Sequence, residues 1–495
     1  MPRLDATTLP GLSTSVWTPR YDRSAVTVGI VHLGVGGFHR SHEALYVDRL
    51  LEAGTQDWGI CGVGVLPSDR RMAEVMAAQD CLYTLVVKYP DGFLDARVVG
   101  SIVEYLLAPD DPDAVVERMA APGTRIVSLT VTEGGYNTSP VTGTFDTGAP
   151  DVVADLQPGA VPRTTFALVT EALVRRRERG LAPFAVVSCD NIPGNGHLAR
   201  DAFAAFAALR DPALGGWVAA EVPFPNSMVD RITPVTTDAD RAQLIQAVGV
   251  EDAWPVICEP WTQWVLEDAF PAGRPPLEDV GVQLVADVAP YELMKLRLLN
   301  AGHQVLGHLG RLAGHEYVHD ACQDPLFREF LLGYLDEEAT PTLAPVPGID
   351  LRRYKADLVG RFANPAVRDT LTRICENSSD RIPQFLLPVL RAQLAAGREI
   401  RRSVAVLAGW AHTAEGADDA GRPLEIVDPR REALVTRARD ADPLAFLREP
   451  DTFGDLADDP RVAAAFTATL TSLRERGART TLEELVRRRG RRTAG

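Results

Sequence analysis

AVTVGIVHLGVGGFHR, residues 25–40, is the stretch that decides the fold. Residues 25–33 form an apolar run rich in β-branched side chains, which predicts a buried strand. Three glycines follow within residues 34–37, and residues 43–52 have the pattern of a helix. A strand, a glycine turn and a helix in this order place a pyrophosphate on backbone N–H groups at the start of the helix. The stretch therefore predicts nucleotide binding, although His39 replaces the last glycine of the GxGxxG pattern.

The glycine turn supplies the first group of predicted cofactor-binding residues. Gly34 permits a tight turn, and Gly36 lets the backbone approach the phosphates closely. From this segment we expect the cofactor to contact Gly34, Gly36, Gly37, Phe38 and Arg40.

An acidic residue follows the second predicted strand, residues 58–66. Asp69 is placed to accept hydrogen bonds from the adenosine ribose hydroxyls, and its charge would repel a 2′-phosphate. This favours NAD over NADP. The gap from Gly36 is longer than the usual ~20 residues, and Arg70 and Arg71 could weaken the discrimination.

Strands and helices then alternate, which predicts a mostly parallel sheet covered by helices. Further β-like runs occur at residues 83–89, 96–102, 125–131 and 184–188, with a helical pattern at 166–179. Polar clusters at residues 130–136 and 188–196 follow two of these strands, where ligands bind in such sheets. The first cluster contains Glu133, a further predicted cofactor-binding residue, and the second contains Asn191. Ordinary turn chemistry is the alternative explanation of both clusters.

The domain organisation follows from a change in periodicity. Residues 223–234 are predicted to form an irregular, proline-bounded loop, followed by strands at 254–259 and 262–266. Beyond the Pro- and Gly-rich residues 270–277, helical patterns dominate, at 327–338, 351–362, 366–374, 382–396, 403–411 and 461–475. We expect an α/β protein: a nucleotide-binding domain with a mostly parallel sheet over residues 1–285 and a mainly α-helical domain over residues 286–495.

The helical part opens with ELMKLRLLNAGH, residues 292–303. At about 100° per residue, the polar side chains that share an arc of roughly 140° are Glu292, Lys295, Asn300 and His303. Asn300 lies at the edge of this arc. Such a face is either chemically active or merely solvated.

Composition excludes several classes of protein. The 495 residues carry a net charge of −16, which argues against nucleic-acid binding. We expect no signal peptide and no membrane span, and we regard the basic residues 487–492 as a solvated terminus. The six cysteines form no CxxC pair, so a reducing cytoplasm is the expected location.

A zinc-protease pattern is the main rival. His315, Glu316 and His319 satisfy HExxH, in which two histidines share a helix face. No third-histidine motif follows. We therefore expect no metal site and interpret the stretch as a surface helix turn.

Four motifs together resemble the polyol-specific long-chain dehydrogenases over nearly the whole chain. They are GVGGFHR at 34–40, SCDN at 188–191, NSMVDRITP at 226–234 and the spacing Lys295-x4-Asn300-x2-His303. The resemblance implies a Rossmann-type domain followed by a helical substrate domain. It also implies zinc-independent, usually NAD-linked oxidation of mannitol to fructose, often by a monomer.

The resemblance also implies roles for individual residues. Lys295 would be the general base, Asn191 and Asn300 would hydrogen-bond the reacting oxygen, and His303 would hold the substrate or orient the base. Glu292 would connect Lys295 to solvent. The residues that would contact the polyol hydroxyls are Asp230, Arg373 and Arg381, the last at a position where the family often carries lysine.

The chemistry is consistent with these roles. Without zinc an amine base is required, and burial must lower the pKa of a lysine from near 10.4 towards about 7–8. Paired amides suit an oxyanion because they add no competing charge. The expected substrate is a polyol or its ketose, with D-arabinitol or a hexuronate (fructuronate or mannonate) as alternatives, since Arg373 and Arg381 could pair with a carboxylate. An NAD-binding regulator without turnover is a further alternative.

Overall fold

The chain forms two compact units, Met1–Ala289 and Pro290–Gly495. The structure is a computed structural model that describes residues 3–12, 16–138 and 144–490. The side chains of Glu133, Val248 and residues 488–490 lie outside this description.

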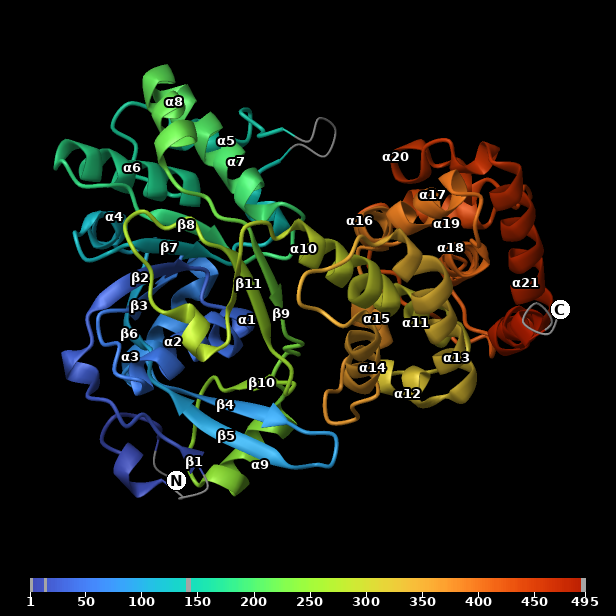
Figure 1. Ribbon diagram of the computed structural model, residues 1–495, viewed down its shortest axis with the longest axis horizontal. Helices are drawn as coiled ribbons and strands as arrows, with labels where there is room; N and C mark the ends of the chain where they lie inside the picture. The colour runs from blue at the N-terminus through green and yellow to red at the C-terminus, as the bar shows by residue number, and fades with distance from the viewer. Residues whose placement is uncertain (1–2, 13–15, 139–143, 491–495) are drawn as a thin grey trace. The chain divides into compact units, whose positions relative to one another are not determined.

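A five-stranded parallel sheet organises the first unit (Figure 1). Its strands are β2 (Val28–Leu33), β3 (Gly59–Gly64), β6 (Ile102–Leu107), β7 (Ile126–Leu129) and β8 (Ala185–Ser188). They lie in the order β6-β3-β2-β7-β8, and every neighbouring pair is parallel. Counted along the chain this is the Rossmann order 3-2-1-4-5. The predicted Rossmann-type sheet is therefore confirmed.

Helices cover both faces of this sheet. Successive residues of β2 point to opposite faces, so Val31 and Leu33 join one core while Ile30 joins the other. The helices of the first unit are α1 (Gly37–Ser41), α2 (Glu43–Glu52), α3 (Arg70–Ala78), α4 (Pro112–Ala120), α5 (Pro150–Asp155), α6 (Thr165–Glu178), α7 (Asn195–Arg210), α8 (Pro212–Glu221) and α9 (Asp238–Val248). Helices α4, α6 and α7 pack over the core of Val31, and α2 and α3 over that of Ile30.

Two smaller sheets complete the unit. The four-stranded sheet has the order β1-β5-β4-β10, and the three-stranded sheet has the order β12-β11-β9. Their strands are β1 (Val16–Trp17), β4 (Tyr83–Lys88), β5 (Leu94–Val99), β10 (Val256–Cys258), β9 (Ser227–Asp230), β11 (Gln263–Glu267) and β12 (Gln283–Val285).

Two predictions for this unit are wrong. The single strand predicted at 96–102 is the end of β5 and the start of β6, because the Gly100 N–H donates to Asp48 Oδ1 at 3.0 Å and turns the chain between two sheets. The loop predicted at 223–234 contains β9, which pairs antiparallel with β11. The prolines of this stretch lie outside the four paired residues, where they remove no ladder hydrogen bond.

The second unit is mainly helical, as predicted. Its helices are α10 (Ala289–Lys295), the π-helix η6 (Leu296–Asn300), α11 (Ala301–Leu312), α12 (Val318–Gln323), α13 (Pro325–Gly333), the π-helix η7 (Tyr334–Ala339), α14 (Leu351–Phe362), α15 (Leu371–Ile374), α16 (Ser378–Phe385), α17 (Leu387–Ala395), α18 (Arg401–Ala414), α19 (Arg431–Ala438), α20 (Pro450–Phe453) and α21 (Pro460–Gly490). Helix α11 is central and packs against α12, α13, α15 and α18 (Figure 1).

One predicted helix of this unit is too long. Only Leu371–Ile374 of the range 366–374 is helical. The backbone before Leu371 makes hydrogen bonds to residues 316–318 instead of helical ones. The Val318 N–H donates to Asp369 O, and the Leu371 N–H donates to Glu316 O, both at 2.9 Å.

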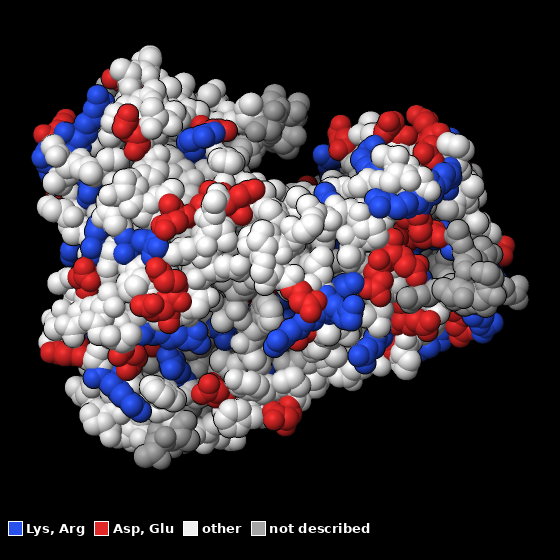
Figure 2. All heavy atoms as spheres, viewed as in Figure 1, with Lys and Arg blue, Asp and Glu red and all other residues white. Residues whose placement is uncertain are grey.

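The described residues include no helix with the length and apolar character needed to cross a bilayer. On the face shown in Figure 2, Lys and Arg side chains are interspersed with Asp and Glu side chains.

Candidate functional site

The turn after β2 has a shape that only glycine can adopt. Gly34 has a φ of +93°, and its N–H donates to Val63 O at 3.0 Å. A Cβ added at Gly34 would lie 2.2 Å from the Thr130 carbonyl oxygen. The loops that follow β2 and β7 therefore touch through backbone, at the point where strand order reverses and such folds bind ligands.

The next glycines leave the start of α1 open. Gly36 is the N-cap of α1, it is exposed, and an added Cβ would meet nothing within 4 Å. An added Cβ at Gly37 would approach Thr233 at 3.6 Å. An open backbone at this turn is what a pyrophosphate requires, so these residues fit a dinucleotide.

Asp69 ends the short 3-10 helix η3 (Pro67–Asp69) that follows β3, so the predicted acid lies just beyond the second strand of the sheet. Its Oδ2 accepts hydrogen bonds from the N–H groups of Val65 and Leu66, both at 2.9 Å. These bonds hold the carboxylate at the carboxyl end of the strand. Arg70 and Arg71 are both engaged elsewhere: Arg70 makes a two-point ion pair with Asp110, and Arg71 lies 4.9 Å above the Trp254 ring.

Arg40 differs from expectation. Its side chain is 1% exposed, and its guanidinium donates to Trp254 O and to Gly36 O. The side chain holds the glycine turn from inside the unit, so a cofactor contact remains a prediction for its backbone alone. Phe38 is half-buried and stacks on His42 with ring centroids 4.9 Å apart.

A buried polar cluster that the sequence did not predict lies beneath the turn. Glu43 Oε2 lies 3.0 Å from His32 Nδ1, 3.2 Å from His39 Nδ1 and 2.9 Å from Ser128 Oγ. Burial lowers the pKa of His39 to about 3. Burial also acts to raise the pKa of Glu43, but the hydrogen bonds from the two histidines outweigh it and lower that pKa.

The geometry of this cluster argues against metal binding. Among the described residues, one group of three or more His, Cys, Asp or Glu side chains has atoms close enough to share a metal ion: His32, His39 and Glu43. However, the two imidazoles stack face to face with centroids 3.4 Å apart and planes 15° apart. A single ion cannot lie in both ring planes, as ligation by both rings requires.

The two polar clusters predicted after β7 and β8 are brought together. Asp190 accepts from the N–H groups of Val131 and Thr132 at 3.2 and 2.9 Å. Asn191, the next residue, is exposed at this edge. Glu133 lies in a short 3-10 helix, and its side chain is outside the described residues.

Asp230 is the last residue of β9 and is 3% exposed. Its Oδ2 accepts from the Trp261 indole N–H at 3.1 Å. The neighbouring Arg231 donates to Glu259 O and Ser41 O, which fixes the loop after the strand.

In the second unit, Lys295 and Asn300 are 7% and 8% exposed. Lys295 ends α10, Asn300 ends the π-helix, and His303 lies in α11 with its ring stacked on Phe362 at 4.2 Å. Glu292 is half-buried one turn before Lys295. Lys295 is therefore largely removed from solvent, which a lysine with a lowered pKa requires.

The π-helix corrects the predicted arc. The Ala301 N–H donates to Leu296 O, five residues back, so this turn contains about one residue more than a turn of an α-helix. The angle between Lys295 and Asn300 falls from about 140° to about 40°, and all four polar residues share an arc of about 80°. Asn300 is therefore not at the edge: the π-turn moves it onto the face of Lys295.

Arg373 and Arg381 lie side by side. Arg373 makes a two-point ion pair with Asp369, whose side chain is 4% exposed. Arg381 donates to Arg373 O and Ile374 O, both at 3.1 Å. Gln304 also donates to Ile374 O at 2.8 Å, which ties this region to α11; neither Gln304 nor Asp369 was singled out in the sequence.

The HExxH stretch does not form a metalloprotease helix. His315 and Glu316 precede α12, which begins at Val318 and contains His319. The expectation of a surface helix turn is wrong for the first three residues, 315–317, because only Val318 and His319 are helical. The two histidines do not share a helix face, which the zinc pattern requires.

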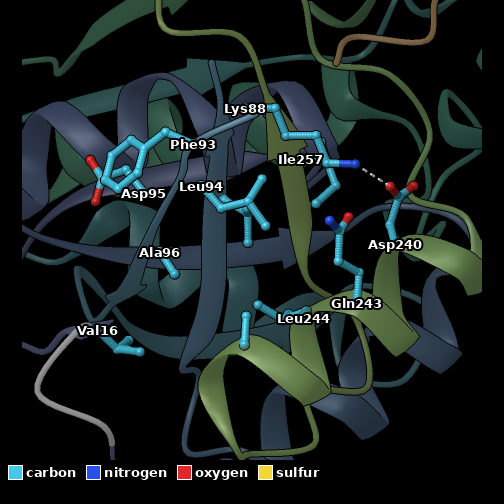
Figure 3. A pocket seen from close by; sticks show the side chains of 12 residues that line it. Val16, Lys88, Phe93, Leu94, Asp95, Ala96, Asp240, Gln243, Leu244 and Ile257 are labelled. Atoms are coloured by element: carbon cyan, nitrogen blue, oxygen red, sulfur yellow. Dashed lines mark hydrogen bonds and ion pairs between the residues drawn. The ribbon is translucent and has the colours of Figure 1, made fainter. Parts of the chain in front are cut away.

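A cavity of about 290 Å³ lies away from these residues (Figure 3). It opens between the four-stranded sheet and α9, and Lys88 Nζ lies 2.5 Å from Asp240 Oδ1 at one end. None of the predicted site residues lines it.

A Rossmann-order sheet with a glycine turn and an acid after the second strand defines a dinucleotide-binding protein. Two family models match the chain: the mannitol dehydrogenase Rossmann domain over residues 28–279 and the mannitol dehydrogenase C-terminal domain over residues 287–474. The chain belongs to the mannitol dehydrogenase family.

Individual relatives match over almost the whole chain. A mannitol 2-dehydrogenase of Aspergillus fumigatus is 45% identical over 478 residues, 94% of this chain and 95% of the relative. The ternary complex of Pseudomonas fluorescens mannitol 2-dehydrogenase with NAD and D-mannitol is 44% identical with a TM-score of 0.90, covering 98% of this chain and 99% of that one. A D-sorbitol dehydrogenase in substrate-free form is 40% identical with a TM-score of 0.90, covering 97% and 100%.

Proposed function

We propose that the protein is an NAD-dependent polyol dehydrogenase that oxidises D-mannitol to D-fructose and catalyses the reverse reaction. The observation that carries the proposal is the full-length likeness, at 44% identity and a TM-score of 0.90, to an enzyme solved with NAD and D-mannitol. The open glycine turn and the burial of Lys295 support it.

The proposed chemistry divides the two hydrogens of the carbinol. The Lys295 amine takes the hydroxyl proton, and the C–H electron pair and hydrogen leave the carbon as the C=O bond forms. When bound, NAD supplies the nicotinamide ring that accepts this hydride. Asn191 and Asn300 donate hydrogen bonds to the oxygen as negative charge develops. His303 orients the base or the substrate, and Glu292 relays the proton to solvent.

The proposal requires no metal ion, because the amine base and the paired amides do the work that a Lewis acid does elsewhere. The π-turn supports this assignment, since it places Asn300 on the same face as Lys295. The HExxH stretch offers no competing zinc site, because His315 lies outside α12.

Selection of NAD over NADP is proposed to depend on Asp69. Its carboxylate is fixed by two backbone N–H groups after β3, where the ribose hydroxyls of a dinucleotide are recognised. The two arginines that could attract a 2′-phosphate are occupied: Arg70 pairs with Asp110 and Arg71 stacks on Trp254.

A neutral polyol fits the remaining predicted substrate residues better than a hexuronate. Arg373 is compensated by the buried Asp369, which reduces its attraction for a substrate carboxylate. Asp230 would repel that carboxylate but can accept from hydroxyl groups. D-sorbitol is the second candidate substrate, because the likeness to a D-sorbitol dehydrogenase has the same TM-score of 0.90.

The substrate assignment is tested by NADH formation with D-mannitol, D-sorbitol, D-arabinitol and mannonate at matched concentrations. We expect the highest kcat/KM with D-mannitol and no turnover of mannonate. Preference for mannonate would overturn the argument from Arg373, and no turnover with cofactor binding intact would favour a regulator.

We further propose that the protein is a monomer in the cytoplasm. All six cysteines are unpaired as thiols and buried, which suits a reducing compartment. Light scattering at micromolar concentration tests the monomer: a mass near 53.6 kDa is expected, and a mass twice as large would contradict it.

A further inference from the structure

We propose that Tyr136 and Asp190 are positioning residues that hold Asn191 in place for the reaction. They do so by locking together the loops that follow β7 and β8. The inference rests on the proposed function, because the residue that the lock positions, Asn191, is proposed to hydrogen-bond the reacting oxygen.

The lock centres on one buried carboxylate. Asp190 is 7% exposed, and its Oδ2 accepts from the Tyr136 hydroxyl at 2.7 Å and from the Val131 N–H at 3.2 Å. Its Oδ1 accepts from the Thr132 N–H at 2.9 Å. The Tyr136 oxygen also lies 2.5 Å from Ser188 Oγ at the end of β8. The Tyr136 hydroxyl and the Val131 and Thr132 N–H groups belong to the loop after β7, so Asp190 joins that loop to its own.

Tyr136 is fixed as a neutral donor. The side chain is 0% exposed, and burial together with the charge of Asp190 raises the pKa of its hydroxyl well above the usual value. A hydrogen bond from a neutral hydroxyl to an ionised, buried acceptor belongs to the stronger class. Removal of the Tyr136 hydroxyl would leave the buried Asp190 carboxylate with one hydrogen bond fewer, which raises the free energy of the folded loops.

The backbone on the other side of Asp190 is fixed as well. Its carbonyl oxygen accepts from the Ile192 N–H at 2.9 Å and from Asn195 Nδ2 at 3.0 Å, and the Cys189 N–H donates to Leu129 O at 2.8 Å. Asn191 lies within this turn and is exposed, next to a residue that is anchored through both its side chain and its carbonyl. Movement of Asp190 therefore moves Asn191.

The opposite loop stores strain that the carboxylate holds in place. Thr132 has a φ of +64° and a ψ of 172°, which is unfavourable for a β-branched residue. Such a conformation costs on the order of 1–3 kcal/mol and persists only where its surroundings enforce it. The bond from the Thr132 N–H to Asp190 supplies that enforcement.

The same network reaches β9. Asn195 Nδ2 also donates to Ser227 O at 2.8 Å, and the Ser227 N–H donates to Asn195 Oδ1 at 3.0 Å. Ser227 begins the strand that ends at Asp230. The lock therefore connects the loop of Asn191 with the strand of a proposed substrate-binding residue.

A double-mutant cycle tests the inference, because only a residue that acts through Asn191 loses its effect when Asn191 is removed. We expect Asn191→Ala to lower kcat for mannitol oxidation by about 100-fold. We expect Tyr136→Phe to lower kcat by about 10-fold in the wild-type chain, because a small displacement of a catalytic group is costly. In the Asn191→Ala chain, the same change should lower kcat less than about two-fold.

Further measurements separate positioning from general damage. For Tyr136→Phe, the Kd for NAD should stay within about three-fold, and the deuterium isotope effect on kcat with C2-deuterated mannitol should increase as hydride transfer becomes slower. Tyr46→Phe is the matched control, because Tyr46 is also a buried tyrosine and its hydroxyl on α2 accepts a hydrogen bond from Thr262 at 3.3 Å. Removal of the Tyr46 hydroxyl should leave kcat unchanged. If Tyr136→Phe does not fold, Ser188→Ala removes the hydroxyl partner of Tyr136 and enters the same cycle.

Three outcomes overturn the inference. They are a kcat within two-fold of wild type for the folded lock variant, the same loss in both backgrounds, and a normal kcat for Asn191→Ala. A wild-type chain that oxidises no polyol overturns the proposed function, and the inference falls with it. If the wild type is active but Tyr136→Phe lowers kcat equally in both backgrounds, the inference is overturned and the proposed function stands.

Discussion

Gly34 and Gly36 are two residues apart, but alanine at these positions should fail in different ways. At Gly34 the φ of +93° costs an L-residue about 1–2 kcal/mol. The new Cβ would lie 2.2 Å from the Thr130 carbonyl oxygen, and the backbone shift needed to relieve this overlap costs about 1–3 kcal/mol more. Together these give roughly 2–5 kcal/mol, or a fall in Tm of about 4–10 °C for a domain of this size.

At Gly36 the fold should tolerate the methyl group. The φ of −92° suits alanine, and an added Cβ meets nothing within 4 Å. We expect Gly36→Ala to change Tm by less than about 3 °C, since replacing an N-cap glycine costs about 1 kcal/mol or less. The methyl group would, however, occupy the space through which a pyrophosphate approaches the backbone, so NAD affinity should fall at least about 10-fold.

Differential scanning calorimetry and NAD titration of the two variants give the comparison. The account predicts low Tm for Gly34→Ala, and near-normal Tm with weak NAD binding for Gly36→Ala. A Gly36→Ala chain that binds NAD normally would refute the placement of the cofactor, and a Gly34→Ala chain with unchanged Tm would refute the strain argument.

Three further predictions follow from single contacts. Burial lowers the pKa of His308 from 6.5 to about 3, so the neutral ring stabilises the fold fully above pH 6.5, and this stabilisation is lost on acidification by up to about 1.4 kcal/mol per pH unit. In urea unfolding between pH 6.5 and 5, the free energy of unfolding of His308→Gln should therefore fall less steeply with pH than that of the wild type. An equally steep fall would contradict the prediction. Asp69→Ala should lower kcat/KM with NAD and raise the ratio of NADP to NAD use about 10-fold or more, in initial rates with each cofactor; an unchanged ratio would remove Asp69 from cofactor selection. Because the rings of His32 and His39 stack face to face, elemental analysis should find no stoichiometric zinc and EDTA should leave activity unchanged, whereas one zinc per chain lost together with activity would refute metal independence.

The sequence predicted those parts of the fold that depend on local patterns. The strand–turn–helix at residues 28–52 and the helix Leu351–Phe362 follow from periodicity and glycine placement. Strand β9 was missed because nearby prolines dominated the local pattern, although none falls within the four paired residues. Its partner β11 is more than 30 residues away, and pairing at that distance leaves no local signal.

Two features of the candidate site's geometry could not be predicted from the sequence. A uniform 100° per residue put Asn300 at the edge of the helix face, because nothing in the sequence of residues 296–299 indicates a π-turn. Arg40 was predicted to contact the cofactor, but its side chain bonds to Trp254 O, over 200 residues away in the sequence. Asp369, by contrast, stands four residues before Arg373, a spacing that could have predicted their ion pair.

Lys295 carries the central claim, and its replacement by alanine is the most direct test. Loss of a general base lowers rates by about 10²–10⁴-fold, so kcat for mannitol oxidation should fall at least about 100-fold while the Kd for NAD stays within about three-fold. Lys355→Ala, which removes a lysine paired with Asp336 on the same unit, is the control and should retain full activity. A Lys295→Ala chain with kcat within ten-fold of wild type would contradict the account.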